Sequence, residues 1–299
     1  MIRALLLLIL LVLMGGALLT PLAYELLRFI YQEVPWPFAR VFDRVAMLVA
    51  FVTIVILRKD FGLLPVKRFL KSGKPLIRLR SFFIGIILSL ACVAIFLPSA
   101  IEQTGWTWQA RPLTDIPLKI LKVSLAACVI ALIEEGFFRV LLLRRALLGL
   151  PSTLAVGLVS LIYAFVHFIT PDKSYVYPGW SLSVGVEYLV LIGERIFLPE
   201  VMMALIGLFC VGLVLGFAMI RTGSLYLCMG LHAGWVFALK MISYFTTSGA
   251  GFDWPAGMMR GYALVANPFG WVSILSVLLV ILALSSIIKW EEKSELFND

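Results

Sequence analysis

The sequence predicts an all-α, polytopic integral membrane protein with about eight transmembrane helices. Of the 299 residues, 62% are hydrophobic and only 14% are charged, and the mean hydropathy is +1.04. Soluble domains carry roughly 25% charged residues, so this composition excludes an ordinary soluble protein. Uncharged runs of about 20 residues, long enough to cross a bilayer as a helix, recur along the chain, whereas the alternating strands of a membrane barrel do not.

The uncharged runs locate the expected spans, and proline marks several of their ends. We expect helices to end or begin at Pro21, Pro98, Pro151 and Pro199, because proline cannot continue a regular helix without losing a hydrogen bond. The eight expected spans are residues 4–20, 41–57, 81–97, 120–143, 152–169, 201–220, 223–245 and 270–288.

Positive charge gathers between the second and third spans and predicts the orientation. Residues 58–80 hold eight Lys or Arg and one Asp, which the positive-inside rule places in the cytoplasm. Counting spans outward puts both termini there, in a multi-pass protein that we expect in a bacterial inner membrane. The net charge of +8 therefore reflects topology and contact with the lipid bilayer, and no nucleic-acid binding is expected. The run at 4–20 exceeds an ordinary signal core and is interpreted as a retained helix.

The chain is interpreted as one membrane domain with three parts. Residues 1–119 supply the N-terminal spans and the basic loop, 120–245 form the core, and 246–299 hold an outer loop, the last span and a short polar tail. Within the core, residues 171–200 are too charged for a confident span and predict an interfacial or partly inserted helix. Residues 246–268 are interpreted as a loop.

Besides Lys122 near its start, three charges interrupt the second half of the apolar run at 120–143. Its fourteen Leu, Ile, Val and Phe favour insertion by roughly 7 kcal/mol, whereas Glu134, Glu135 and Arg139 oppose it by roughly 9 kcal/mol. Glu135 and Arg139 are four residues apart on one helix face, so we expect them to pair. Glu134 then points about 100° away, and an ionisable group at such a place suggests function. Alternatively, all three charges lie near the cytoplasmic end as topology determinants, although Glu134 is ten residues, about 15 Å, before Arg144.

Both histidines of the chain lie in apolar runs. His167 lies in SLIYAFVHFITP and His232 in LYLCMGLHAGWVFALK. Either alone would more often be a hydrogen-bonded structural residue, but two of two in expected spans point to a site. The small residues Gly230 and Gly234 permit close helix approach, through which His232 could reach Glu134.

These motifs resemble those of the CAAX protease and bacteriocin-processing family, also called Abi. Its members are glutamate-dependent intramembrane proteases related to type II CAAX prenyl endopeptidase. The resemblance covers about 120–240, with one mild departure in the second motif and a larger one in the third. The matching positions are Glu134, Glu135 and Arg139 for E-E-x-x-x-R, Tyr163 and His167 for F-x-x-x-H, and His232 and Val236 for H-x-x-x-N.

The resemblance implies an intramembrane endopeptidase that cleaves a membrane-anchored or hydrophobic peptide. Glu134 and His167 would hold and deprotonate the attacking water, and His232 would donate a hydrogen bond to the developing oxyanion. Glu135 and Arg139 would support them.

The third motif leaves other functions open. Val236 stands where the family has asparagine, so a backbone N–H, the Trp235 indole or a water would have to replace that donor. A catalytically inactive relative that acts as a membrane scaffold is one alternative. A proton-coupled transporter is another, although no inverted repeat is visible.

No cofactor is expected. The sequence has no H-E-x-x-H zinc motif, no G-x-G-D aspartyl motif and no G-x-S-x-G serine motif. A metal site built from Glu134, His167 and His232 is the weaker alternative to a metal-independent enzyme. The four cysteines form no C-x-x-C pair and are interpreted as small core residues, at Cys92, Cys128, Cys210 and Cys228.

Overall fold

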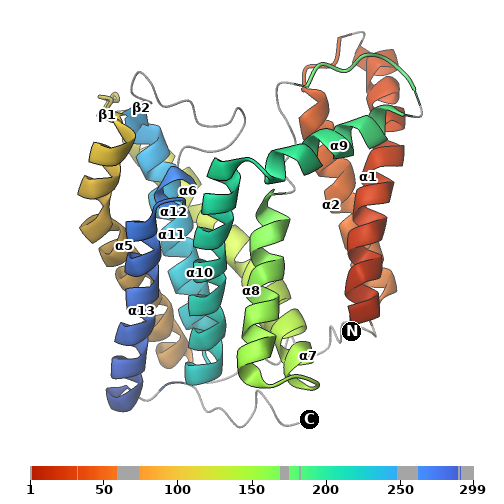
Figure 1. The fold of residues 1–299 in the computed structure, drawn as a ribbon. Coiled ribbons are helices and arrows are strands. Elements are labelled where there is room, and N and C mark those ends of the chain that lie inside the picture. The colour runs from red at the N-terminus through yellow and green to blue at the C-terminus, as the bar shows by residue number, and fades with distance from the viewer. Residues whose placement is uncertain are drawn as a thin grey trace. The chain divides into compact units, whose positions relative to one another are not determined.

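The structure, a computed structural model, is almost entirely helical and confirms the all-α membrane class (Figure 1). It describes residues 2–31, 33–58, 74–168, 175–181, 183–247, 262–288 and 290. The chain forms two compact units. The first contains residues 1–63, 167–201 and 255–258, and the second contains residues 64–166, 202–254 and 259–299.

Among the described residues, six helices are long and apolar enough to cross a membrane. Two further expected spans are present as helices that miss this criterion: α2 (Phe38–Ile56) carries three charges in its first two turns, and α8 (Ser152–Phe168) is short. The six are α1 (Ile2–Tyr31), α5 (Pro75–Thr104), α6 (Asp115–Glu135) with its continuation to Leu147, α10 (Pro199–Thr222), α11 (Leu225–Phe245) and α13 (Pro268–Ile287).

The long helices of the described chain number nine rather than eight. The additional one is α9 (Val184–Ile196), which lies within residues 171–200 as the predicted helix. Glu187, Glu194 and Arg195 occupy this helix together with buried Tyr188, so it is amphipathic. Its position at a membrane interface stays a prediction.

Two of the four proline predictions are wrong. Pro21 lies inside α1 and Pro98 lies inside α5, and both helices continue well beyond them. The expectations for Pro151 and Pro199 are confirmed, because α8 starts at Ser152 and α10 starts at Pro199. A long apolar helix tolerates an internal proline when its neighbours accommodate the freed backbone carbonyl.

Pro21 illustrates that accommodation in the first unit. Proline 21 deprives the Ala17 carbonyl of its i+4 donor, and Gly185 of α9 packs directly on that oxygen. A Cβ at position 185 would overlap the carbonyl, so only glycine permits this approach. The α1–α9 contact therefore depends on one residue without a side chain.

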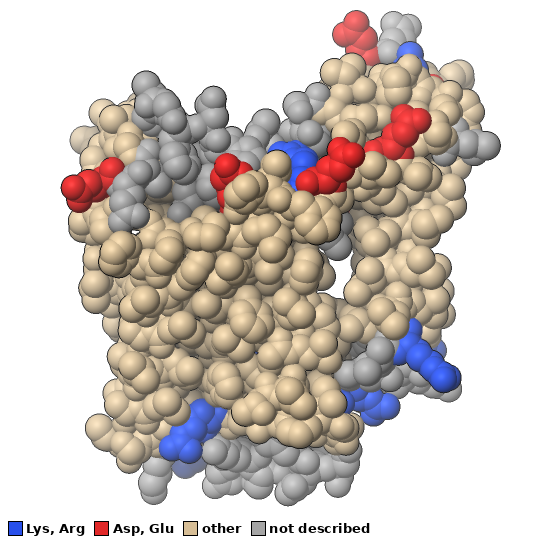
Figure 2. Space-filling view, viewed as in Figure 1, with Lys and Arg blue, Asp and Glu red and all other residues tan. Residues whose placement is uncertain are grey.

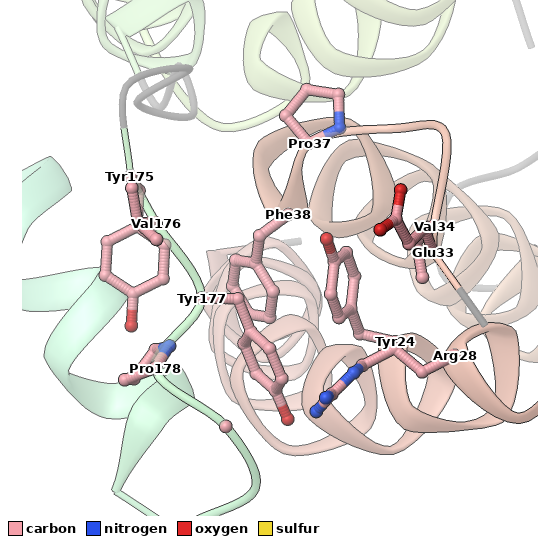
Figure 3. A pocket seen from close by; sticks show the side chains of 11 residues that line it. Tyr24, Arg28, Glu33, Val34, Pro37, Phe38, Tyr175, Val176, Tyr177 and Pro178 are labelled. Atoms are coloured by element: carbon pink, nitrogen blue, oxygen red, sulfur yellow. The ribbon is translucent and has the colours of Figure 1, made fainter.

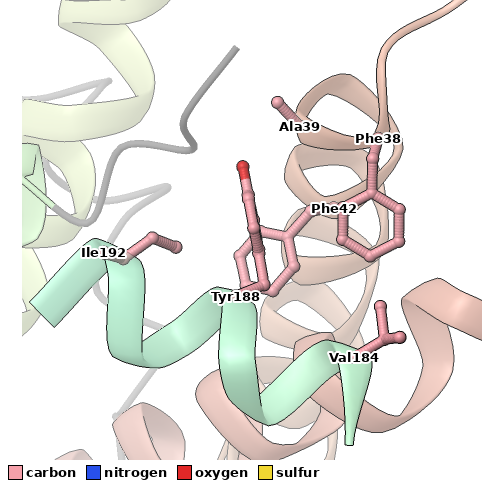
Figure 4. Packing of buried hydrophobic residues seen from close by; sticks show 6 residues of the cluster. All are labelled: Phe38, Ala39, Phe42, Val184, Tyr188 and Ile192. Atoms are coloured by element: carbon pink, nitrogen blue, oxygen red, sulfur yellow. The ribbon is translucent and has the colours of Figure 1, made fainter. Parts of the chain in front are cut away.

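The core of the first unit joins α2 to α9 (Figure 4). Phe38 and Phe42 of α2 both pack edge-on against Tyr188 of α9, with ring centroids 5.1 Å apart in each pair. Aromatic rings bury large apolar areas, and edge-to-face pairs add to that stabilisation. The buried members of this cluster are Phe38, Ala39, Phe42, Val184, Tyr188 and Ile192.

A pocket of about 450 Å³ lies beside this core, and aromatic side chains line much of it (Figure 3). Tyr177 stacks on Phe38 at 5.2 Å between centroids, and its hydroxyl donates a hydrogen bond of 2.9 Å to Glu25 Oε1. Burial and the neighbouring Glu25 carboxylate raise the pKa of Tyr177 above its ordinary value. The segment 175–181 is thereby fastened to α1 and α2.

In the second unit, α11 packs closely on α5 through glycine. A Cβ at Gly230 would overlap the Phe82 carbonyl, and one at Gly234 would overlap Ser89 Oγ. Gly85 of α5 lies equally close to the backbone of α11 at Leu227. Small residues on both helices thus bring their backbones together, as membrane helices require for tight packing.

Helix ends in this unit carry the expected signals. α5 starts with Pro75 and is followed by Gly105 in a left-handed conformation at φ +61°. The Ser224 side chain accepts a hydrogen bond from the Leu227 backbone and so caps α11.

The end of α11 corrects the loop prediction at 246–268. Thr246–Thr247 forms strand β2, which pairs antiparallel with β1 (Thr107–Trp108), and Tyr262–Val265 forms α12. Residues 248–261 of that expected loop lie outside the described residues, and α13 already begins at its last residue, Pro268. The β1–β2 pair fastens the end of α5 to the end of α11.

On the face of the second unit that Figure 2 draws, the visible charged side chains gather toward the helix ends. Figure 2 shows a broad belt over α8, α10 and α13 that is free of Lys, Arg, Asp and Glu on the face drawn. Many large apolar side chains of α6 and α13 are exposed, including Ile133, Val272 and Leu279. An exposed apolar belt is the surface that a bilayer covers.

The cysteine prediction holds for three residues and fails for one. Cys92, Cys210 and Cys228 are buried and free, whereas Cys128 is exposed on α6. Its side chain lines a small, mainly apolar pocket between α5, α6 and α11. α6 presents much of its surface outward, which sequence position alone does not reveal.

Candidate active site

The first motif straddles a change in helix type. α6 ends at Glu135 and continues as a π-helix, η1 (Gly136–Leu143), before α7 (Arg144–Leu147). A π-helix is rare and is frequently found at functional sites. The sequence predicts a single regular helix here. Nothing in a run of Leu, Phe and Val indicates that the α-helix changes to the wider π-helix.

Glu135 holds the centre of a buried polar cluster. Arg139 Nε donates a hydrogen bond of 2.9 Å to Glu135 Oε2, and both side chains are fully buried, so the pair predicted from their spacing is present. The second carboxylate oxygen, Oε1, lies 2.8 Å from His232 Nδ1. Because a carboxylate paired with arginine can only accept, His232 Nδ1 donates this bond. Glu135 therefore joins α6, η1 and α11.

Glu134 approaches the other nitrogen of the same imidazole ring. Its Oε2 lies 3.7 Å from His232 Nε2, which is beyond hydrogen-bonding distance but within reach of a shared partner. The Glu134 side chain is 27% exposed, whereas that of Glu135 is fully buried. Glu134 therefore has the more accessible side chain of the two, while its Oε2, the oxygen that faces His232, is itself buried.

Alanine rather than glycine brings α11 to α6. Ala127 and Ala131 of α6 form a buried cluster with Ala233 of α11, next to His232 in sequence. The glycines on either side of His232 pack against α5 instead. His232 does reach the glutamates, but not through the glycine contact that we expected. The glycines and the histidine occupy different faces of α11.

Tyr163 forms an aromatic wall of the cluster. Its ring lies edge-on to the His232 ring at 6.1 Å between centroids, and the Arg139 guanidinium lies over it at 5.6 Å. Phe138 packs edge-on from the other side at 5.1 Å. From the sequence, Tyr163 is only a departure from the phenylalanine of the second motif. Its position in that motif was the signal that could have identified it as part of the site.

The spacing and order of these residues are matched by a known family. Residues 116–238 match the model of the type II CAAX prenyl endopeptidase Rce1-like family. This segment is similar to a CAAX-protease domain. The match begins at the start of α6 and ends within α11, so it contains every residue of the cluster. Searches of curated proteins and of solved structures found no match to the chain.

The second histidine of the CAAX-protease motifs lies at the end of α8. His167 is half-buried, one helical turn beyond Tyr163, and belongs to the first unit. Its convergence with Glu134 and His232 on one centre stays a prediction.

Trp235 and Val236, the two expected neighbours of an oxyanion beside His232, lie in different surroundings. The Trp235 indole is buried beside Cys92 of α5. Val236 is half-buried and packs against the alanine cluster between α6 and α11. Position 236 is therefore on the side of α11 that faces α6, one turn from His232.

Two further observations concern what the buried polar cluster around Glu135 could bind. Within the described parts of the chain, no group of three or more His, Cys, Asp and Glu side chains is arranged to hold a metal ion. The terminal nitrogens of Arg139 are buried and find no hydrogen-bond acceptor among the described residues. The guanidinium is held by Glu135 and by the face of Tyr163 instead.

Proposed function

We propose that this chain is an intramembrane endopeptidase that hydrolyses a peptide bond with a water activated by Glu134. The family match supports a membrane protease of the CAAX type in general. The observation that carries the finer proposal is the position of His232, with one ring nitrogen bonded to Glu135 and the other turned toward Glu134. Adjacent glutamates thereby acquire different tasks.

Glu135 and Arg139 are positioning residues in this proposal. A hydrogen bond from one imidazole nitrogen to a carboxylate fixes the orientation of the ring. Arg139 holds the Glu135 carboxylate in place, since a buried carboxylate needs a partner. His232 Nε2 is then directed at the space in front of Glu134.

Glu134 is the proposed general base. It is the more exposed carboxylate, and a base must be reachable by the water from which it takes the proton. His167 is the proposed second group that holds this water.

His232 is the proposed donor to the oxyanion. Since Nδ1 donates to Glu135, a donor at Nε2 requires the imidazolium form of the ring. The charges of Glu134, Glu135, Arg139 and an imidazolium at His232 sum to zero, which suits a low-dielectric site. A donor aimed at the developing negative charge lowers the barrier most where water is excluded.

The substrate that we propose is a membrane-anchored or hydrophobic peptide, because the cluster lies among apolar helices that expose apolar side chains. One observation favours a second candidate, an inactive relative that acts as a scaffold. Val236 offers no hydrogen bond at the position where the family has asparagine, which removes one expected oxyanion donor.

A reconstituted cleavage assay tests the proposal. Purified protein in liposomes is incubated with a library of membrane-anchored peptides, and products are identified by mass spectrometry. We expect cleavage that Glu134→Gln abolishes and that the control Glu102→Gln, an exposed acid at the end of α5, leaves unchanged. Intact peptides in every lane would favour the scaffold. Proton flux without cleavage would favour a transporter.

A further inference from the structure

Four basic side chains surround a second pocket at the far end of the α6–α11 pair. The pocket has a volume of about 400 Å³ and is lined by Arg111, Lys119, Lys122 and Lys240 around Tyr244. Its lining includes no Asp or Glu, and none of the four cations forms an ion pair with a carboxylate of the described residues. Like charges so close together repel one another unless an anion lies between them.

Tyr244 organises two of these cations. Arg111 Nε donates a hydrogen bond of 2.9 Å to the Tyr244 carbonyl, and its guanidinium lies 4.8 Å from the centre of the Tyr244 ring. Lys119 Nζ lies 4.7 Å from the same centre. The backbone bond uses only Nε of Arg111, so the terminal guanidinium nitrogens remain available for two parallel bonds to a phosphate.

Membrane topology does not account for these charges. The basic stretch 58–80, which predicts the cytoplasmic side, extends into the start of α5 at Pro75, whereas the β1–β2 pair follows the opposite end of that helix (Figure 1). Arg111 of the pocket bonds to the Tyr244 carbonyl, two residues before β2, so the pocket lies at this opposite end. Loops on the side opposite the cytoplasm ordinarily carry few Lys and Arg. Four basic residues gathered there need another explanation.

The surroundings of the pocket have the residue pattern of a helix end at the depth of lipid headgroups. Leu118, Leu121 and Leu125 are more than half exposed on α6, interleaved with Lys119 and Lys122. An apolar helix surface that ends in lysines is the pattern of a segment leaving the hydrocarbon for the interface. A basic pocket between helix ends at that depth fits an anionic headgroup.

We infer that this pocket binds a phosphate group, and that its source is an anionic phospholipid of the surrounding bilayer. The inference is independent of the proposed peptidase. Lys122 precedes Glu134 by twelve residues on one helix, which is about 18 Å, so the pocket and the glutamate–histidine cluster do not overlap.

Lipid binding to the intact protein tests the inference. The protein is placed in nanodiscs of phosphatidylcholine alone or with about one third phosphatidylglycerol, a net-negative mixture that attracts basic residues. Retained lipids are counted by native mass spectrometry, and the thermal midpoint is measured. Inorganic phosphate added to the phosphatidylcholine discs forms a separate arm.

The double variant Lys119→Gln/Lys240→Gln is compared with Lys74→Gln/Arg145→Gln, which removes two exposed charges at the other helix ends. We expect the first pair to weaken the tightest phosphatidylglycerol binding by about thirty-fold and the control pair to weaken it far less. Both should melt like the wild type in phosphatidylcholine, which shows that they fold.

Protection by phosphatidylglycerol but not by free phosphate supports the lipid as the source. Equal protection by free phosphate keeps the anion site and overturns its assignment to lipid. Equal losses in the two variant pairs, or no protection by either anion, would overturn the site itself.

Discussion

At the scale of single residues, two neighbouring glutamates have opposite environments. Glu135 is fully buried with both oxygens engaged, by Arg139 and by His232, whereas Glu134 is partly exposed. Because the two acids are adjacent in α6, their side chains point in different directions. That of Glu135 contacts α11, and that of Glu134 faces the space beside His232. A substitution should therefore have a different consequence at each position.

We expect Glu134→Gln to abolish cleavage without lowering the amount of folded protein, because it removes the base and little packing. Glu135→Gln should instead reduce folded protein, because loss of one partner of a buried ion pair costs roughly 3–5 kcal/mol. Detergent-solubilised yield, thermal midpoint and peptide cleavage measure the two effects. Equal yields with equal loss of activity would contradict this division.

Val236 carries a second prediction at this scale. Val236→Asn places an amide one turn from His232, on the face that packs toward α6. If the amide reaches the oxyanion, the rate should rise by part of the 10²–10³-fold, or about 3–4 kcal/mol, that one such donor typically contributes. Steady-state cleavage and thermal midpoint give the answer. A less stable protein with unchanged activity would remove this helix from the oxyanion assignment and strengthen the scaffold hypothesis.

At the scale of elements, α11 is positioned by two different contacts. Its glycine face lies on α5, and its alanine and histidine face lies on α6. The first contact sets how close the helices come, and the second sets the hydrogen bond between His232 and Glu135. Changing the first should disturb the second.

We expect Gly230→Ala to destabilise the protein by about 1–3 kcal/mol, since its methyl group overlaps the Phe82 carbonyl and forces α11 away from α5. Gly157→Ala in α8 is the matched control. A Cβ there meets no atom within 4 Å, so that variant should be neutral or more stable by up to about 1 kcal/mol. Thermal unfolding of both proteins is the measurement. Equal midpoints would show that the close approach is not required.

In the first unit, the hydrogen bond that holds the 175–181 segment on α1 depends on pH. Folding raises the pKa of Tyr177 above the ordinary value of about 10, through burial and its bond to Glu25. The stabilisation is fully present below pH 10 and is lost at higher pH, where the unfolded chain releases the proton first. We expect the thermal midpoint to fall above pH 10 in the wild type and to fall less steeply in Tyr177→Phe. Parallel curves for the two proteins would assign the alkaline loss to other groups.

At the scale of the whole molecule, the arrangement of charge along the chain predicts its orientation in the membrane. The basic loop at 58–80 and both termini are expected in the cytoplasm. In a background with the exposed Cys128 replaced by serine, Lys74→Cys should react with a membrane-impermeant maleimide only after the cytoplasmic face is opened. Thr107→Cys in β1, at the other end of α5, should react in intact cells. The reverse result would invert the topology.

The sequence by itself determined the fold class, most spans and the pair of Glu135 with Arg139. These depend on local quantities: the length of an apolar run, the pitch of a helix and a separation of four residues. The motif positions in α6, α8 and α11 were available for the same reason, because residue type and order suffice to name them.

Only the tertiary structure decided that His232 bonds to Glu135 and also faces Glu134, that glycine packs α11 on α5, and that the helix widens after Glu135. Tertiary structure also decided that α1 and α5 continue past their internal prolines. Each of these depends on which face of one helix meets another, and that choice is made by the packing of small residues across interfaces between distant segments. Which helix faces meet depends on all of these contacts together, so it cannot be derived from any one segment of the sequence.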